Sequence, residues 1–191
     1  MLGTQPLPPE HLGAEALFRA YAGFIAGFLV RMGVPFAELD DLVQEVFLVA
    51  LRKGGYYRGP AQPRTWLSAI ALRVAQASRR TRNTRNMRET PDSDALDLLP
   101  LAASDEGERL DARRRVQKVQ HALSSLADEH RAAFLLYELE GESCESIAAA
   151  WNVPVGTVYS RLHYARRRFL QAYNALSLAP SDEPQPNAVQ R

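Results

Sequence analysis

The sequence predicts an all-α protein built from two small helical domains joined by a flexible linker. Apolar residues recur at helical spacing along most of the 191-residue chain, and the alternation typical of strands is nearly absent. Residues 84–107 interrupt this pattern with Asn, Thr, Pro, Asp, Ser and Gly. We therefore place the first domain at 13–83, the flexible linker at 84–107, the second domain at 108–173 and a disordered tail at 174–191.

The first domain is predicted to contain three helices, over 13–32, 38–53 and 64–82. A broad apolar face marks the first of them and consists of Leu17, Tyr21, Phe24, Ile25, Phe28 and Leu29. The turn GVP at 33–35 ends that helix, and GGYYRGPAQP at 54–63 is a loop by composition. The three helices are expected to bury a common core.

The second domain is predicted to contain four helices, over 109–126, 129–140, 143–150 and 155–173. Ser143 suits the N-cap of the third, which leaves Ile147 and Trp151 to pack inward. Asn152 tolerates the left-handed conformation that ends a helix, and Pro154 suits the start of the next one. This order of helix, sharp turn and helix is typical of a helix-turn-helix.

The last predicted helix is apolar on one side and basic on the other. Its buried face is predicted to consist of Val155, Val158, Leu162, Ala165 and Phe169. Its outward face is then Gly156, Ser160, His163, Tyr164 and Arg167, flanked by Thr157, Arg161 and Arg168. Such a helix fits the DNA major groove, where its first turns reach base edges and arginines hold phosphates. The alternative is an amphipathic surface helix whose basic face is only solvated.

Charge is distributed unevenly along the chain, although the formal net charge is +1. Eight arginines and no acid lie from Arg58 to Arg88, and eight acids and one arginine lie from Glu89 to Asp111. This order indicates an anion-binding surface beside an acidic spacer.

Several classes of protein are disfavoured. Cys144 is the only cysteine, which excludes an intramolecular disulfide and a Cys-cluster zinc site and fits a reducing compartment. The N-terminus does not resemble a signal peptide, and no apolar stretch approaches the length of a membrane helix. The four histidines lack metal-ligand spacing, and no nucleophile elbow or phosphate loop is present. We expect a cytoplasmic protein that is not an enzyme, has no cofactor and does not insert into membranes.

Three stretches resemble the sigma-70 family, and most closely its extracytoplasmic-function (ECF) subgroup. LSSLADEHRAAFLLYELEGESCESIAAAWNVPVGTVYSRLHYARRRF, at 123–169, is similar to the family's C-terminal DNA-binding domain, domain four. DDLVQEVFLVAL, at 40–51, resembles the helix that binds core polymerase, and YYRGPAQPRTWLSAIALRVAQASRR, at 56–80, resembles the segment that opens the promoter. The ECF subgroup has only these two domains, which agrees with the length of this chain.

The resemblance implies three sets of binding residues. The set for core polymerase is Asp40, Asp41, Gln44, Glu45 and Leu48. The set for minus-ten DNA is Tyr56, Tyr57, Arg58, Gln62, Arg64, Trp66, Arg73, Arg79 and Arg80, with 59–63 as the pocket for a flipped base. The set for minus-thirty-five DNA is Thr157, Ser160, Arg161, His163, Tyr164, Arg166, Arg167 and Arg168.

Three residues within these sets differ from the others in expected role or from many relatives in identity. Trp66 is expected to belong to the core rather than to serve as a stacking platform for bases. Arg73 stands where many relatives carry Asn, and Tyr164 stands where many carry a basic residue. A phenol cannot read guanine through two hydrogen bonds as a guanidinium does, so base recognition depends more on Ser160, His163 and Arg167.

The sequence thus predicts a bacterial alternative sigma factor with a three-helix promoter-melting domain and a four-helix DNA-binding domain. Its expected partners are core RNA polymerase, at the clamp and flap, promoter DNA, and an anti-sigma protein wedged between the two domains. The alternative is a stand-alone helix-turn-helix regulator whose N-terminal domain senses a signal or dimerises.

Overall fold

The computed structural model of the chain describes residues 13–53, 61–86 and 106–178. These residues form α1 (Ala14–Arg31), α2 (Phe36–Arg52), α3 (Pro63–Asn86), α4 (Glu106–Ser124), α5 (Asp128–Phe134), a π-helical segment η2 (Leu135–Leu139), α6 (Cys144–Trp151) and α7 (Val155–Leu178). Within the described ranges there is no strand, so the predicted all-α class is confirmed.

Three predicted helix boundaries are wrong by several residues. α3 continues past 82 to Asn86, since residues 83–86 contain no Gly or Pro and Thr84 Oγ donates to the Arg80 carbonyl. α4 begins at Glu106, inside the predicted linker. α7 continues past 173 to Leu178 and ends two residues before Pro180. The rings of Phe169 and Tyr173 stack along it, with 6.0 Å between their centroids. Residues 87–105 and 179–191 of the predicted linker and tail lie outside the described residues.

The helix predicted over 129–140 is divided. It begins as α5 and changes to the π-helical η2 at Leu135, where the backbone takes one extra residue per turn. The Glu140 N–H then donates to the Leu135 carbonyl (3.2 Å), and Gly141, at φ +69°, turns the chain toward α6. Of the three acids in this region, Glu138 lies within η2, whereas Glu140 and Glu142 follow it before α6 begins.

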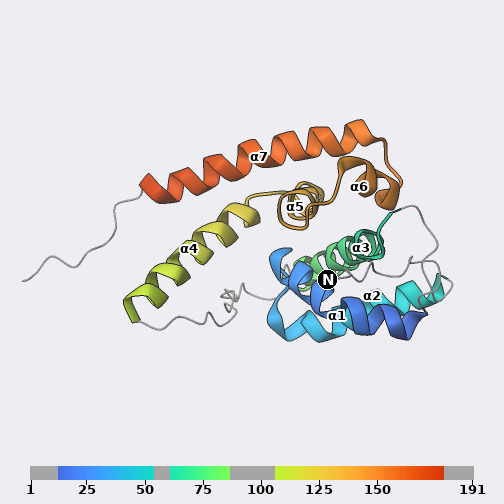
Figure 1. Cartoon of the computed structure of the whole chain (residues 1–191). Coiled ribbons are helices and arrows are strands. Elements are labelled where there is room, and N and C mark those ends of the chain that lie inside the picture. The colour runs from blue at the N-terminus through green and yellow to red at the C-terminus, as the bar shows by residue number, and fades with distance from the viewer. Residues whose placement is uncertain (1–12, 54–60, 87–105, 179–191) are drawn as a thin grey trace, which may run out of the picture.

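The first domain is a three-helix unit in which α1, α2 and α3 all contact one another (Figure 1). The fully buried side chains of α1 include Leu17, Ile25 and Phe28, as the predicted apolar face required. They meet Val46 of α2 and Leu67 of α3, both of which are fully buried. Burial of about 1.5–3 kcal/mol per large apolar side chain is the main stabilising term of such a unit.

The helix-turn-helix is formed by α6 and α7 with the predicted capping. Ser143 Oγ accepts the Ser146 N–H (3.1 Å), and Asn152 adopts the left-handed conformation (φ 54°, ψ 51°). Val158, Leu162 and Ala165 are buried as predicted. The prediction that Val155 is buried was wrong: it is the first residue of α7, where it is 39% exposed.

The two domains pack against each other. α3 lies between the rest of the first domain and the pair α5 and α6 (Figure 1). Buried residues of both domains form one connected hydrophobic cluster. The sequence predicted two units joined by a linker, and the contact between them is a feature that only the tertiary structure shows.

Truncation of Leu162 to alanine tests the assigned inner face of α7. Leu162 is 3% exposed, so Leu162→Ala should lower the unfolding free energy by about 2–4 kcal/mol, through lost burial and the cavity that remains. Leu170, on the same helix, is 57% exposed, so Leu170→Ala should change it by less than about 0.5 kcal/mol. Urea unfolding followed by circular dichroism measures both, and equal effects would contradict the assignment.

Candidate nucleic-acid interface

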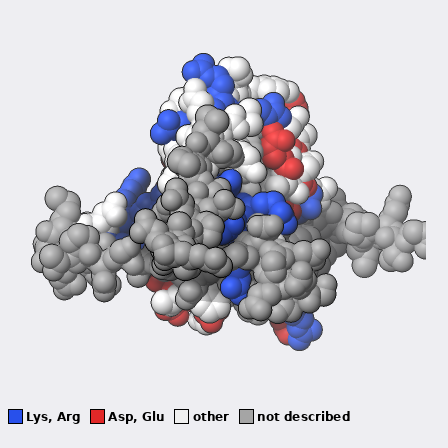
Figure 2. Space-filling model, turned by 90° about the vertical axis from the view of Figure 1, so that its left-hand side faces the viewer, with Lys and Arg blue, Asp and Glu red and all other residues white. Residues whose placement is uncertain are grey.

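The outward face of α7 is exposed as the sequence predicted. Gly156, Ser160, His163, Tyr164 and Arg167 all reach solvent, and so does Arg168 beside them. Thr157 is half-buried in the first turn, where its N–H donates to the Pro154 carbonyl (2.9 Å). Lys and Arg side chains gather at the top of the molecule in Figure 2, at the height where α7 lies in Figure 1. This face is therefore available to a polyanion.

Two other arginines of α7 already have partners within the second domain. Arg166 Nε bonds Glu138 Oε1 (2.6 Å), and its guanidinium lies over the Tyr137 ring, 5.0 Å from the centroid. The hydrogen bond to Glu138 raises the pKa of Arg166. Arg161 lies over the Trp151 ring at 5.6 Å. The sequence did not predict these contacts, which hold both cations at the edges of the outward face.

Tyr164 packs against His130 of α5, with 4.6 Å between ring centroids and 34° between ring planes. Tyr164 is nevertheless 51% exposed, so one side of its ring remains open to a ligand. Burial, and then the positive charge of Arg161, lower the pKa of His130 below its ordinary value. This contact fixes the direction of the ring and explains why a flat aromatic side chain fits at position 164.

The acidic face of α2 is exposed beside its buried apolar side. Asp40, Asp41 and Gln44 are exposed, and Leu48 is 45% exposed. Glu45 is half-buried and lies 3.6 Å from Arg52. The predicted set of core-polymerase residues thus occupies one helical face.

The predicted minus-ten residues fall into several places. Tyr56, Tyr57 and Arg58 lie outside the described residues. Gln62 is exposed just before α3, and Trp66 is half-buried and packs against the core, in agreement with its predicted structural role. The structure does not bring Arg73 to the other residues of this set, because it lines a groove between α2 and α3 that also includes Glu45 and Lys53.

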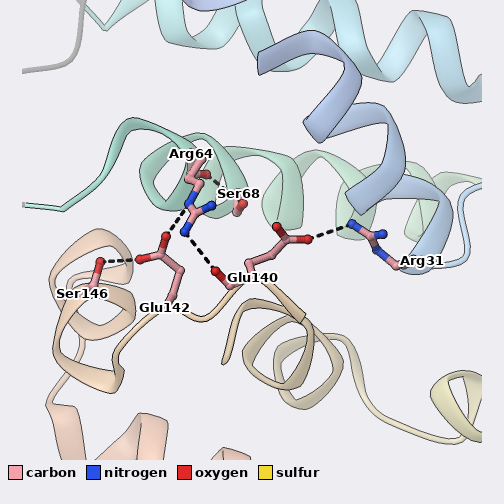
Figure 3. Close-up of polar contacts among 6 residues, drawn as sticks. All are labelled: Arg31, Arg64, Ser68, Glu140, Glu142 and Ser146. Atoms are coloured by element: carbon pink, nitrogen blue, oxygen red, sulfur yellow. Dashed lines mark hydrogen bonds and ion pairs between the residues drawn. The ribbon is translucent and has the colours of Figure 1, made fainter. Parts of the chain in front are cut away.

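Arg64, another predicted minus-ten residue, points into the junction between the domains (Figure 3). Its Nε donates to Glu142 Oε1 (2.6 Å) and its Nη2 to the Glu140 carbonyl (2.9 Å). The Glu142 side chain is only 4% exposed and also accepts from Ser146 Oγ (3.0 Å). Glu140 in turn pairs with Arg31 of α1 (2.9 Å).

Arg79 is the second predicted minus-ten residue at this junction. It pairs with Asp128 at the start of α5 (2.7 Å) and donates to the Met32 carbonyl (2.9 Å), whereas Arg80 beside it is exposed. Gln76, one turn earlier on α3, donates to Glu129 (2.6 Å). Burial alone would raise the pKa of Glu129, but hydrogen bonds from its own backbone and from Gln76 hold it below its usual value.

Arg131 lies buried at the same junction, with 3% of its surface exposed. It donates to three carbonyls near the end of α4, those of Leu123 (2.7 Å), Ser124 (3.0 Å) and Leu126 (3.0 Å), and to the Met32 carbonyl of the first domain (2.5 Å). Burial, and then the nearby charge of Arg79, lower its pKa to about 10.

The sequence did not predict the partners at this junction, above all Arg131, Glu140 and Glu142. One signal for Arg131 is its position directly before the apolar run AAFLL, although the polar residues DEH precede it. The acids at 138, 140, 142 and 145 form a second such signal. Neither signal identifies a partner, because the partners are remote in sequence.

Other chemistry is not indicated by the described residues. They include no group of His, Cys, Asp and Glu that could hold a metal ion. Cys144 is buried, and burial raises the pKa of its thiol, which is opposite to the shift of a reactive cysteine. Among the same residues, no helix combines the length and hydropathy needed to span a bilayer.

The lowered pKa of His130 predicts a loss of stability in mild acid. Because the unfolded chain has the higher pKa, near 6.5, it binds more protons just below that pH, and stability falls as pH drops through this window. The His130→Phe variant keeps an aromatic ring against Tyr164, but this ring cannot titrate. The denaturant midpoint of its unfolding should therefore fall less than that of the wild-type chain between pH 7 and pH 5.5. Both chains carry the same carboxylates, so an equal fall in both would contradict the assignment.

Comparisons with known proteins match both halves of the chain. The family model for Sigma-70 region 2 matches residues 17–85, and the model for Sigma-70, region 4 matches residues 116–169. The RNA polymerase sigma-H factor of Pseudomonas aeruginosa is 33% identical over 171 residues, which cover 85% of this chain and 86% of the relative. The ECF RNA polymerase sigma-E factor of Escherichia coli is 35% identical over 144 residues, covering 72% and 75%.

Two solved structures share the fold. The sigma factor RpoE in complex with the anti-sigma factor NepR from Bartonella quintana superposes with a TM-score of 0.63, at 21% identity, covering 87% of this chain and 98% of that one. CnrH in complex with the cytosolic domain of CnrY gives 0.55, also at 21% identity, covering 85% and 88%.

Both domain matches occur in one chain, in the family's order, and the match to the relatives extends across the junction between them. Members of this family are initiation factors for RNA polymerase and not enzymes. The chain belongs to the sigma-70 family and is an alternative sigma factor of the ECF type, which directs RNA polymerase to promoters for transcription initiation.

Proposed function

We propose that three surfaces of this sigma factor divide the work of initiation. The exposed face of α2 binds core RNA polymerase, the segment around residues 56–80 holds and opens minus-ten DNA, and the outward face of α7 reads minus-thirty-five DNA. The observation that carries the proposal is the outward face of α7, which is exposed and basic and lies in a capped helix-turn-helix. An α-helix of about 10–12 Å diameter fits the major groove.

Base reading falls to the first turns of α7. Ser160 and His163 are exposed. Both side chains carry donor and acceptor groups of the kind that hydrogen-bond to base edges. Tyr164 offers one ring face and its hydroxyl, with its orientation fixed by His130. Arg167, at the centre of the outward face, is the residue suited to a guanine.

Phosphate binding falls to the flanking arginines. Arg168 is exposed and suited to a direct phosphate contact. Arg161 packs on Trp151, and Arg166 bonds Glu138. To bind a phosphate, each arginine must either turn away from its partner or keep that contact and use its remaining N–H groups. Their contribution to DNA affinity is therefore smaller than that of Arg168.

The α2 surface combines carboxylates with apolar area, as in the polar rim and apolar centre of a protein interface. Asp40, Asp41 and Gln44 supply polar contacts that fix register, and exposed Leu48 supplies contact area. We assign the polymerase clamp to this face, and the flap to the second domain.

We further propose that this factor works in the cytoplasm and is held inactive by an anti-sigma protein. In one similar structure the sigma factor RpoE is bound by the anti-sigma factor NepR. In the other, CnrH is bound by the cytosolic domain of CnrY. A stand-alone helix-turn-helix regulator is disfavoured, because such a protein has no need of the region 2 match at residues 17–85.

Alanine substitutions on α7 separate readers of bases from holders of phosphates. Ser160→Ala and His163→Ala should change which upstream duplex is preferred, at about 1–3 kcal/mol for each good base contact. Arg168→Ala should weaken all duplexes alike and reduce the slope of log affinity against log salt by about one. Holoenzyme binding to randomised upstream duplexes at two salt concentrations measures both effects. An unchanged preference in the Ser160 and His163 variants would show that α7 is not the reader.

Charge reversal on α2 tests the polymerase surface. Asp41→Lys together with Glu45→Lys should weaken binding to core polymerase by at least tenfold, about 1.4 kcal/mol, because two complementary charges become repulsive. Glu15→Lys reverses an exposed charge on α1 and should leave the affinity within about twofold. Titration of labelled full-length protein with core polymerase gives the affinities, and circular dichroism checks folding. Wild-type affinity in the double variant would refute this surface.

A further inference from the structure

We propose that a cavity at the end of α1, where α1 meets α4 and α5, binds a small oxyanion of the phosphate class. The cavity has a volume of about 210 Å³. The residues on its wall that bear on the proposal are Arg31, Gly33, Arg79, Gln120 and Arg131, and none of the described lining residues is acidic. They come from α1, the turn after it, α3, α4 and α5, so a bound anion would touch several elements at once.

The charge at this cavity is the first argument. Arg31 donates to Glu140 (2.9 Å; Figure 3), and Arg79 pairs with Asp128 (2.7 Å). Arg131, in contrast, donates only to carbonyl oxygens. Among the described residues, three guanidiniums therefore have two carboxylates within bonding distance. One positive charge is left without a partner of opposite sign.

The close approach of two guanidiniums is the second argument. Arg79 Nη2 (2.9 Å) and Arg131 Nη1 (2.5 Å) share the Met32 carbonyl as acceptor. A Cβ built on Gly33 would lie 3.0 Å from the same Nη1 and 3.6 Å from the same Nη2, so this glycine keeps the space beside both cations open. Burial, and then the charge of Arg79, lower the pKa of Arg131 to about 10. An anion in that space would offset the repulsion between the two cations.

Free hydrogen-bond donors are the third argument. A guanidinium carries five N–H groups, of which Arg79 uses one for Asp128 and one for Met32. The Nε of Arg31 is buried and has no hydrogen-bond partner, which is costly unless a ligand supplies an acceptor. Gln120 brings a side-chain amide with two further N–H groups to the same wall. A tetrahedral oxyanion can accept from several of these donors together.

The size of the cavity narrows the ligand. Sites for drug-sized molecules usually measure about 300–1,000 Å³, so this smaller cavity suits one phosphoryl group and not a base and sugar as well. Guanidinium forks match the oxygens of a phosphate. The phosphoryl group can belong to free phosphate or to the end of a nucleotide whose remaining atoms lie outside. The inference goes beyond the proposed function, because it involves neither α7 nor promoter DNA.

Thermal unfolding of the full-length protein, followed by circular dichroism, tests the site with inorganic phosphate as the probe. Chloride is exchanged for phosphate at constant ionic strength. At about tenfold excess over its dissociation constant, phosphate should raise the unfolding midpoint of a chain of this length by about 3–6 °C. The same titration with adenosine diphosphate distinguishes the two sources, since a response to the nucleotide alone identifies a terminal phosphate as the ligand.

Two variants at Gln120 locate the effect. Gln120→Glu puts a carboxylate beside the cations, so it should raise the midpoint in chloride and abolish the response to phosphate. Gln120→Ala removes the amide donors and adds no charge, so it should weaken the apparent phosphate affinity by about tenfold. The matched control is Gln117→Glu, the same change at an exposed position of α4, and it should respond as the wild-type chain does.

Three results would overturn the proposal. The first is the absence of any response to phosphate or to adenosine diphosphate in the wild-type chain. The second is a wild-type response in both Gln120 variants, because the anion would then act elsewhere, such as on the basic face of α7. The third is a response to a short single-stranded oligonucleotide alone, which would indicate a DNA backbone contact instead of a small ion. Each of these results leaves the sigma-factor assignment intact.

Discussion

The buried guanidinium of Arg131 is the contact on which the arrangement of this sigma factor depends. It satisfies carbonyls near the end of α4, where the chain turns into α5, and it also reaches the Met32 carbonyl at the end of α1. Helix C-termini carry partial negative charge and unpaired carbonyls, so one buried cation stabilises two such ends at once. A hydrophobic side chain of equal size would leave these acceptors unsatisfied at about 1–3 kcal/mol each.

The backbone of the first domain is adapted to that contact. Gly33 turns the chain after α1 at φ +83°, and a Cβ built there would lie 3.0 Å from Arg131 Nη1. The glycine is thus required both by its conformation and by the close approach of the second domain. Arg79 donates to the same Met32 carbonyl, which places two guanidiniums near one another. Burial lowers the pKa of Arg131 most, and the nearby charge of Arg79 lowers it further.

α3 is the element that both domains share. Its apolar side completes the core of the first domain through residues such as Leu67, and the side with Arg64, Gln76 and Arg79 meets the second domain. The same helix contains most of the described residues assigned to minus-ten DNA. α3 therefore uses one face for the core of its own domain and another face for the contact with the second domain.

Most of the helices, the caps at Ser143 and Asn152, most of the inner face of α7 and the family could be predicted from the sequence. These features depend on spacing within about one or two helical turns or on motifs read along the chain. It could not determine the partners of Arg31, Arg64, Arg79 and Arg131. Those partners lie between 47 and 109 residues away, apart from the α4 carbonyls near Arg131. A charged side chain on a helix has the same local pattern whether it faces water, DNA or another domain, since its environment is set by remote elements. Which arginines are paired depends on the packing of the domains, which places acids of the second domain, Asp128, Glu129, Glu140 and Glu142, against α3 and α1.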